Sequence, residues 1–177
     1  MASPRDYKNT IVPNWCPGCG DYGIQNAISA VCAKKGWANE DITLISGIGC
    51  SSRIGGYQYC YGAHTTHGRA LPFAQGIKCA NKDQHMIVCS GDGDSYAIGL
   101  GHAMHAIKRN MDITYLVFDN QVYGLTKGQT SPASDKGFVT KTTPDGNPLT
   151  PRRYLRSTGL CYRQQDHDQR HRKSCRP

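Results

Sequence analysis

The sequence has no apolar run of about 18 residues, the length that a helix needs to cross a bilayer. We therefore expect no membrane span. The first residues, Met1–Asp6, lack the apolar core of a secretory signal peptide, so we expect a cytoplasmic protein. No internal repeat is present either. With 177 residues, 38% of them hydrophobic, and 20 glycines, the chain is expected to form a globular, turn-rich α/β domain.

Acidic residues are few: 13 Asp and Glu stand against 21 Lys and Arg, which gives a formal net charge of +8. The excess is concentrated in residues 151–177, which hold eight basic and two acidic side chains. Residues 1–150 hold 13 basic and 11 acidic side chains, a net charge of +2. A strongly basic surface attracts nucleic acid, but a nearly neutral body argues against a nucleic-acid partner.

Nine cysteines are many for a chain without a secretion signal, and a disulfide framework is not expected in that setting. The spacing indicates a metal or cluster site instead. Cys16 and Cys19 form a Cys-x-x-Cys pair that suits zinc as well as an iron–sulfur cluster, and Cys50 lies on a Gly-rich turn. Free cysteine behaves as a small hydrophobic residue. Four others are therefore expected to be ordinary buried thiols: Cys32, Cys60, Cys79 and Cys89.

Apolar runs alternate with helical periodicities along the chain. Buried strands are predicted at residues 41–46, 85–90 and 113–118. Helices are predicted from Ile24 to a stop at Gly36, from near Pro72, and over residues 95–108. Residues 1–14 are expected to form an extended arm, and residues 53–66 an irregular segment. Alternating strands and helices predict a parallel sheet with flanking helices, in which ligands bind at the carboxyl ends of the strands.

The most informative stretch begins at Gly91-Asp92-Gly93-Asp94 and ends at Asn120. Both ends of this stretch follow a predicted strand, so both are expected at one edge of the sheet. The glycines let the backbone approach a ligand closely. Asp92 and Asn120 offer the oxygen ligands that Mg²⁺ prefers, and Mg²⁺ leaves its other positions to phosphate oxygens, carbonyls and water. This arrangement suits a metal bound to a diphosphate, and thiamine diphosphate is the cofactor whose proteins carry it.

Another glycine pair, in Gly99-Leu100-Gly101, lacks the third glycine of a dinucleotide fingerprint, so no nicotinamide site is expected.

Five motifs in a fixed order resemble one family. They are Trp15-Cys16-Pro17-Gly18-Cys19-Gly20, Ser46-Gly47-Ile48-Gly49-Cys50-Ser51-Ser52, His67-Gly68-Arg69-Ala70, Gly91-Asp92-Gly93-Asp94 and Asp119-Asn120-Gln121-Val122-Tyr123-Gly124-Leu125-Thr126. Over about residues 7–147 the chain resembles the β subunit of 2-oxoacid:ferredoxin oxidoreductases, and is most similar to the 2-oxoglutarate type. The resemblance implies a thiamine-diphosphate-binding α/β fold.

The resemblance also implies a reaction. A 2-oxoacid, coenzyme A and oxidised ferredoxin give an acyl-CoA, CO2 and reduced ferredoxin. Thiamine diphosphate, held by Mg²⁺, acts as the electron sink for decarboxylation, and a [4Fe–4S] cluster carries the electrons out. The substrate favoured by the resemblance is 2-oxoglutarate, with pyruvate as the other candidate. An α subunit is implied as partner, because this family takes the glutamate that activates the thiamine from it.

Residue roles follow from the resemblance position by position. Asp92, Asn120 and the carbonyl of Val122 match the magnesium ligands, and His67 matches a contact to the diphosphate. Further residues match the cofactor-binding segments: Gly91, Gly93, Asp94, Tyr123, Gly124 and Leu125. Cys16, Cys19 and Cys50 match three of the four cluster ligands, and the fourth is not identified. Arg53, just after the Cys50 turn, is suited to the substrate carboxylate, since Arg binds carboxylates through two parallel hydrogen bonds.

The chain departs from the family after Asn147, and the later strands of the family are missing. We expect residues 1–147 to form the thiamine-diphosphate-binding domain. Residues 148–177 are basic and have no apolar periodicity, which predicts disorder. They are interpreted as a disordered basic arm, a nucleic-acid contact, or the frameshifted end of a truncated gene. The joint loss of resemblance, apolar pattern and charge balance favours the last.

Three other functions stay open at this point. The chain is compatible with a subunit of a non-oxidative thiamine-dependent decarboxylase, which needs no cluster. An inactive fragment is a second alternative. The third is a metal or cluster protein with a nucleic-acid-binding tail.

Overall fold

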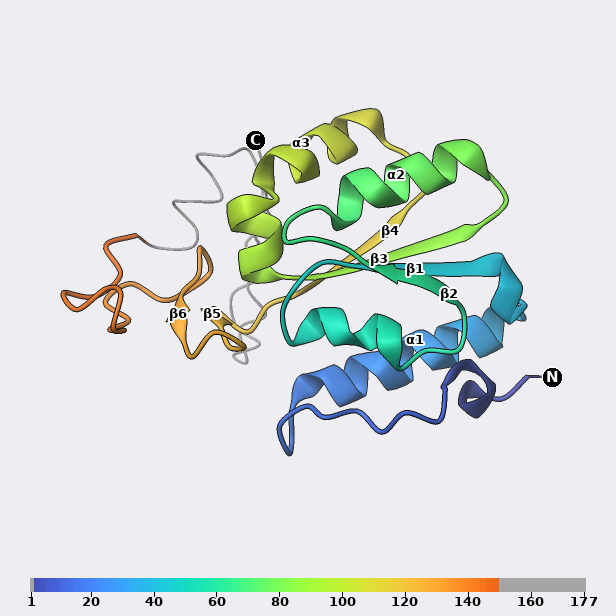
Figure 1. Cartoon of the computed structure of the whole chain (residues 1–177), viewed down its shortest axis with the longest axis horizontal. Coiled ribbons are helices and arrows are strands. Elements are labelled where there is room, and N and C mark those ends of the chain that lie inside the picture. Colours follow the sequence, from blue (N-terminus) through green and yellow to red (C-terminus); the bar gives the residue numbers. More distant parts are fainter. Residues whose placement is uncertain (1, 150–177) are drawn as a thin grey trace, which may run out of the picture.

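The computed structural model describes residues 2–149 and contains a four-stranded, fully parallel sheet. The strand order is β2-β1-β3-β4 (Figure 1). The strands are β1 (Ile42–Ser46), β2 (Tyr61–His64), β3 (His85–Gly91) and β4 (Thr114–Phe118). The predicted parallel sheet is confirmed. All four strands point the same way, so the turns that follow them meet at one edge.

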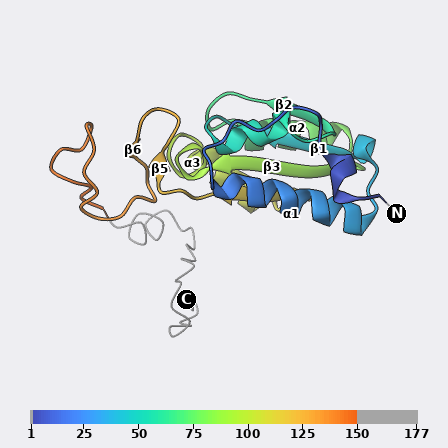
Figure 2. The same ribbon diagram turned by 90° about the horizontal axis from the view of Figure 1, so that it is seen from below.

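Helices cover both faces of the sheet, which makes three layers (Figures 1 and 2). The helix α1 (Gly20–Lys35) lies on one face, and α2 (Ala70–Ala80) and α3 (Leu100–Arg109) lie on the other. Side chains of a strand point alternately to its two faces. In β1, Leu44 packs toward α1 while Ile45 packs toward α2. This double burial explains why the strands read as continuous apolar runs.

Two helix signals in the sequence are confirmed. Gly36 ends α1 in the left-handed conformation, with φ 67°, and its N–H donates to the carbonyls of Ala33 and Cys32. Pro72 lies in the first turn of α2, where a missing N–H costs nothing.

The segment 53–66 is not irregular throughout, which corrects the expectation. It contains most of a 3₁₀ helix, η3 (Ser51–Gly56), and the edge strand β2. The strand β2 pairs only with β1 and is largely exposed, so its sequence carries no apolar alternation. Its pairing with β1 is a tertiary contact that local patterns do not encode.

The helix predicted over 95–108 is two helices. A π-helix, η4 (Asp94–Ile98), is followed by α3, and Gly99 separates them. The break lies where two backbones touch. A Cβ added at Gly68 would lie 2.7 Å from the Gly99 nitrogen, and one added at Gly99 would lie 2.4 Å from the Asp94 carbonyl oxygen. This contact between loops overrides the local helical pattern.

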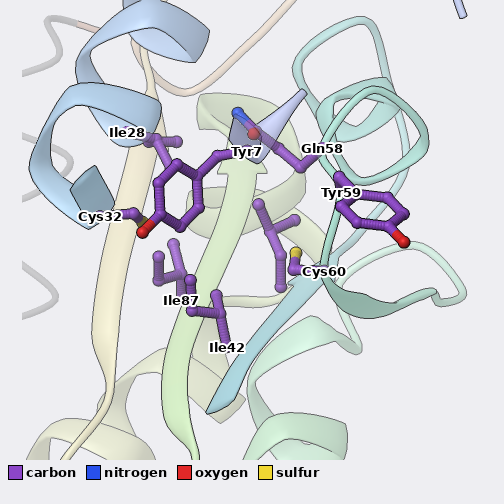
Figure 3. Close-up of a pocket in the computed structure, with 9 residues that line it drawn as sticks. Tyr7, Ile28, Cys32, Ile42, Gln58, Tyr59, Cys60 and Ile87 are labelled. Atoms are coloured by element: carbon purple, nitrogen blue, oxygen red, sulfur yellow. The ribbon is translucent and has the colours of Figure 1, made fainter. Parts of the chain in front are cut away.

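The N-terminal arm is not simply extended. It includes the 3₁₀ turn η1 (Pro4–Tyr7), and the buried Tyr7 hydroxyl donates to the Trp37 carbonyl oxygen at 2.6 Å. Under Tyr7 lies a cavity of about 10 Å³, shown in Figure 3. Its lining residues are Tyr7, Ile28, Cys32, Ile42, Leu44, Gln58, Tyr59, Cys60 and Ile87. That volume holds one water at most, so this cavity is no substrate site.

The four cysteines expected to be buried differ in their exposure. Cys32 and Cys89 are fully buried and Cys60 is half-buried, while Cys79 is exposed, which corrects that expectation. Burial raises the pKa of the Cys60 thiol to about 11 and the pKa of Cys89 further. Such thiols are unreactive packing residues.

After β4 the chain leaves the sheet. A short hairpin of β5 (Val122–Tyr123) and β6 (Gln129–Thr130) leads into an irregular loop that extends away from the sheet edge (Figures 1 and 2). Within residues 2–149, no helix is long and apolar enough to cross a membrane. The basic tail over 148–177 was expected to be disordered. From residue 150 on, it lies outside the described residues.

Candidate active site

The predicted site residues meet at the carboxyl edge of the sheet. Cys50 follows β1, His67 follows β2, Asp92 follows β3 and Asn120 follows β4. The segments that follow β1, β2 and β3 are joined by direct hydrogen bonds, described below. The sequence expectation of one shared site at this edge is therefore supported by contacts.

Asp92 is the deepest of these side chains, with 2% exposure. The hydroxyl of Ser131 donates to its Oδ2 oxygen. Burial raises the pKa of the Asp92 carboxyl to about 6, and the nearby charge of Asp119 adds to the increase, while the hydrogen bond from Ser131 lowers it. A buried carboxylate with a raised pKa is stabilised by a nearby cation. This donor set fits a magnesium ion.

The Asp94 carboxylate contacts neighbouring turns of the protein itself. Its Oδ1 oxygen accepts hydrogen bonds from the N–H of Gly68 at 2.7 Å and of Ile48 at 3.3 Å, and it also contacts Nδ1 of His67. Its Oδ2 oxygen is buried without a hydrogen-bond partner, and a Cβ added at Gly47 would lie 1.8 Å from it. Asp94 therefore ties together the turns after β1, β2 and β3.

His67 is held by this arrangement. Its Nδ1 is engaged by Asp94, and its side chain is 34% exposed. Its ring lies edge-on to Tyr123, with centroids 6.1 Å apart. A carboxylate on one imidazole nitrogen fixes the ring orientation, which suits a contact with a phosphate.

The segment after β4 places Tyr123 beside the Gly-Asp-Gly turn. Asn120 is exposed, and its Oδ1 accepts the Val122 N–H at 3.2 Å. The Tyr123 hydroxyl donates to the carbonyl oxygen of Gly93 at 3.1 Å. A Cβ added at Gly93 would lie 2.3 Å from the Tyr123 ring, so only glycine fits under it. Leu125, predicted to bind cofactor, is 54% exposed.

Gly124 lies between the two predicted cofactor sites. A Cβ added there would be 3.5 Å from Nδ2 of Asn120 and 3.7 Å from Sγ of Cys50. The amide assigned to magnesium and a thiol assigned to the cluster are therefore neighbours.

The cysteine turns are held together by Trp15. Its indole N–H donates to the Cys50 carbonyl oxygen at 2.7 Å, and its ring packs edge-on against Tyr22 and Tyr57. Cys16 and Cys19 close a tight turn through the bond from the Cys19 N–H to the Cys16 carbonyl, at 3.0 Å. This anchors the Cys-x-x-Cys turn beside Cys50.

The three thiols influence one another. Burial is the largest cause that raises the pKa of Cys50, followed by the charges of Asp21, Cys16 and Cys19, and the guanidinium of Arg53 opposes the increase. In residues 2–149, no three His, Cys, Asp or Glu side chains surround the position of one metal ion. A [4Fe–4S] cluster takes one cysteine for each iron. Three thiols on two turns that Trp15 joins fit it as a partial ligand set.

Arg53, assigned to the substrate carboxylate, lies in η3 and is exposed. Its effect on the Cys50 pKa places its charge near that thiol. The guanidinium is thus at the same sheet edge as the cofactor residues.

Sequence reasoning missed several residues that build the site. Ser131 and Ser134 are buried in the loop after β6, and Asn147 donates to the Ser134 carbonyl oxygen at 2.8 Å. Serine and asparagine are common in loops, so no local signal marks these positions. Trp15 stands beside the first cysteine in a motif, which was a usable signal for its anchoring role.

The chain is similar to a known family and to several known proteins. The family described as "Thiamine pyrophosphate enzyme, C-terminal TPP binding domain" matches residues 47–173. The 2-oxoglutarate oxidoreductase subunit KorB of Mycobacterium tuberculosis is 48% identical over 143 residues, which are 81% of this chain and 38% of that protein. The 2-oxoglutarate synthase subunit KorB of Methanocaldococcus jannaschii is 44% identical over 133 residues, which are 75% of this chain and 49% of that protein.

A solved structure is similar as well. It is the 2-oxoglutarate:ferredoxin oxidoreductase from Magnetococcus marinus with 2-oxoglutarate, coenzyme A and succinyl-CoA bound. The TM-score is 0.83 at 42% identity, and the alignment covers 90% of this chain and 56% of that chain. The chain spans about half the length of the curated relatives it matches, or less. The chain therefore belongs to the thiamine pyrophosphate enzymes, and its homologues there are the β subunits of 2-oxoacid:ferredoxin oxidoreductases.

Proposed function

We propose that this chain carries the thiamine diphosphate and iron–sulfur ligands of a 2-oxoacid:ferredoxin oxidoreductase. The reaction converts a 2-oxoacid and coenzyme A into an acyl-CoA and CO2 and passes the electrons to ferredoxin. One observation carries the proposal: a Cβ at Gly124 would touch both the Asn120 amide and the Cys50 thiol. Oxidative decarboxylation needs the carbon chemistry and the electron exit side by side, and these side chains adjoin.

The chain's own residues bind and orient the cofactor. Asp92, Asn120 and the Val122 carbonyl would hold a magnesium ion for the diphosphate, and these are the hard oxygen ligands that Mg²⁺ takes. His67, whose ring is fixed through Nδ1 by Asp94, would contact the diphosphate. Bound thiamine diphosphate supplies the electron sink for the loss of CO2.

The cluster is held in part by Cys16, Cys19 and Cys50, as thiolates. It supplies a one-electron path out of the site. Trp15 positions the two cysteine turns relative to each other through its bond to the Cys50 carbonyl oxygen. The fourth ligand lies outside the set identified in this chain.

The substrate is a small 2-oxoacid, and 2-oxoglutarate is favoured over pyruvate. The support is that two relatives are named for 2-oxoglutarate and that the similar structure was solved with it. Arg53 is exposed at the same edge and binds a substrate carboxylate through two parallel hydrogen bonds. Coenzyme A is the co-substrate. The partners are an α subunit that supplies the activating glutamate and a ferredoxin that accepts the electrons.

The test is anaerobic coexpression with the α subunit. We expect reduction of a low-potential acceptor that depends on both 2-oxoglutarate and coenzyme A, with acyl-CoA as product. Iron and sulfide analysis of the same preparation separates this function from a non-oxidative decarboxylase, which needs no cluster. Decarboxylation by protein that contains no iron or sulfide would overturn the proposal.

The Asp92→Ala variant tests the cofactor site alone. We expect it to lose thiamine diphosphate binding, because the diphosphate loses its metal bridge. Isothermal titration of the cofactor in Mg²⁺ buffer measures this. Unchanged affinity in the variant would contradict the assignment of Asp92.

A further inference from the structure

The loop after β6 reaches back to the metal-binding carboxylate. Ser131 lies 39 positions after Asp92 in the sequence, is 3% exposed, and donates its hydroxyl proton to Oδ2 of Asp92. Asp92 accepts this side-chain hydrogen bond from a residue that has no counterpart among the motifs read from the sequence. The family resemblance assigns no role to Ser131.

The direction of the Ser131 hydroxyl is fixed by its surroundings. A hydroxyl has one proton to donate. Its oxygen accepts the N–H of Ala133 at 3.1 Å, so the proton is left for Asp92. The backbone of Ser131 is fixed as well, since its N–H donates to Oγ of Ser134 at 2.8 Å.

The loop that carries Ser131 is itself locked. The Ser134 hydroxyl donates to the Gln121 carbonyl oxygen, beside the predicted magnesium ligands Asn120 and Val122. Asn147 donates to the Ser134 carbonyl oxygen at 2.8 Å. Ser131 is therefore held in place from both sides of the loop, and it is not a mobile side chain that happens to reach Asp92.

A carboxylate restrained in this way has limited freedom toward a cation. The Ser131 hydroxyl takes one of the two lone pairs of Asp92 Oδ2 and fixes the rotation of the carboxylate, so ligation of a metal through both oxygens is disfavoured. Ca²⁺ commonly takes carboxylates through both oxygens, in flexible geometry with six to eight ligands. Mg²⁺ is smaller, demands an octahedron and is bound through single oxygens.

We propose that Ser131 is a positioning residue that restricts Asp92 to single-oxygen ligation and thereby favours Mg²⁺ over Ca²⁺ in thiamine diphosphate binding. This inference rests on the proposed function, since it requires Asp92 to bind the cofactor metal. It adds a determinant of metal choice that the ligands alone do not provide. Partners of metal ligands typically change metal affinity by about 10- to 100-fold when removed.

The test measures thiamine diphosphate affinity by titration in Mg²⁺ and, separately, in Ca²⁺, with the chain coexpressed with its α subunit. In Ser131→Ala we expect Mg²⁺-supported affinity to fall by about tenfold or more. Ca²⁺-supported affinity should fall less, so the ratio of the two affinities decreases. Ser131→Cys, which is close in size but a weak donor, should behave like Ser131→Ala. Ser131→Thr, which keeps a hydroxyl, should restore the ratio.

Thr142→Ala is the matched control. It removes an exposed hydroxyl later in the same loop that bonds Thr140 and not Asp92, so it should leave the ratio of the two affinities unchanged. Melting temperatures without metal report on the loop in every variant. An unchanged metal ratio in both Ser131→Ala and Ser131→Cys overturns the inference, even where both affinities fall.

The wild-type chain and Asp92→Ala separate this inference from the proposed function. If the wild type binds no thiamine diphosphate in either metal, or if Asp92→Ala binds as the wild type does, the proposed function fails. If the wild type binds and Asp92→Ala does not, an unchanged ratio in the Ser131 variants removes only the role of Ser131.

Discussion

Two aspartates of one turn have different tasks. Asp92 and Asp94 are separated by a single glycine and both are nearly fully buried. Asp92 accepts a hydrogen bond from one hydroxyl, and its carboxyl has a raised pKa, which suits a ligand for a cation. Asp94 accepts hydrogen bonds from two backbone N–H groups and contacts Nδ1 of His67, so it joins neighbouring turns. The environment, and not the residue type, favours Asp92 over Asp94 as the proposed metal ligand.

The pKa of Asp92 predicts a pH dependence for cofactor binding. A metal ligand must be deprotonated, so protons compete with Mg²⁺. The folded-state pKa, about 6, lies above the ordinary 3.8, so the cofactor-free protein binds this proton more tightly than the unfolded chain does. It loses stability as the pH rises from about 4 through about 6, and bound Mg²⁺ offsets that loss.

We therefore expect thiamine diphosphate affinity in Mg²⁺ to be constant above about pH 7 and to fall by about tenfold per unit well below pH 6. Titrations between pH 5 and pH 8 measure it. Asp92→Asn, which does not titrate, serves as the control and should bind weakly with little pH dependence. A wild-type affinity that stays constant down to pH 5 would contradict this prediction.

The close approach at Gly47 gives a second prediction at this scale. A Cβ there would lie 1.8 Å from Oδ2 of Asp94. Gly47→Ala should displace that carboxylate and loosen its bonds to Gly68 and His67. We expect a loss of about 1–3 kcal/mol in the free energy of unfolding, as is usual for overpacking, together with weaker cofactor binding.

Gly23→Ala is the control for Gly47→Ala. Gly23 lies inside α1, and a Cβ there would meet nothing within 4 Å. Because alanine favours helix, this variant should be about 0.5–1 kcal/mol more stable than the wild type. Denaturant unfolding measures both, and equal effects of the two substitutions would refute the steric argument.

At the scale of elements, the turn before α1 depends on a side chain outside the helix. Trp15 packs between Tyr22 of α1 and Tyr57 after η3, and it bonds the Cys50 carbonyl oxygen. One aromatic residue thereby joins two turns that are 35 positions apart. The adjacency of the three cysteines depends on this packing.

Trp15→Phe tests the role of that anchor. It keeps an aromatic ring and removes the N–H donor, so the Cys50 carbonyl loses its bond. We expect a loss of about 1 kcal/mol in the free energy of unfolding and a lower iron and sulfide content in anaerobically purified protein. Trp37→Phe is the comparison, since Trp37 stacks on His85 away from the cysteines. It should leave the iron content unchanged, and an equal loss of iron in both variants would argue against the anchor.

At the scale of the whole molecule, the contacts of Asn147 hold the loop that supports the site. Asn147 is 8% exposed, and its side chain and backbone bond the segment 134–138. Through Ser134 this segment supports Ser131 and hence Asp92. The domain boundary at 147 stays a prediction, and Asn147 itself is packed against the described loop.

Two truncations test that boundary. A chain ending at Leu149 should keep the melting temperature and the thiamine diphosphate affinity of the full chain. A chain ending at Gly146 should lose both in part, because Ser134 and Asp135 lose their bonds to Asn147. Equal behaviour of the two truncated chains would contradict a supporting role for Asn147.

The first truncation also tests a nucleic-acid function. Residues 1–150 carry a net charge of +2, against +8 for the full chain. If the tail binds DNA, binding should weaken steeply with salt and should disappear in the shorter chain. We expect no such binding.

Sequence patterns predicted the elements that are buried on both faces. The apolar runs at 42–46 and 85–91 are the two central strands, which must be apolar on both sides. The run at 114–118 was also readable, although this strand lies at the edge of the described sheet and only Phe118 is buried. The glycine stop at Gly36 and the acidic turn at Asp92 were also readable, because each needs a specific residue at a specific backbone position. In both cases the chemistry is local.

By itself, then, the sequence determined the layered parallel sheet, the edge at which the motifs meet and the family. Only the tertiary structure decided the edge strand β2, the break at Gly99, the tasks of Asp94 and the bond from Ser131 to Asp92. Each of these arises from contacts between segments far apart in the chain. Local periodicity and motif spacing report on neighbours in sequence, and such contacts become defined only when the sheet brings the turns together.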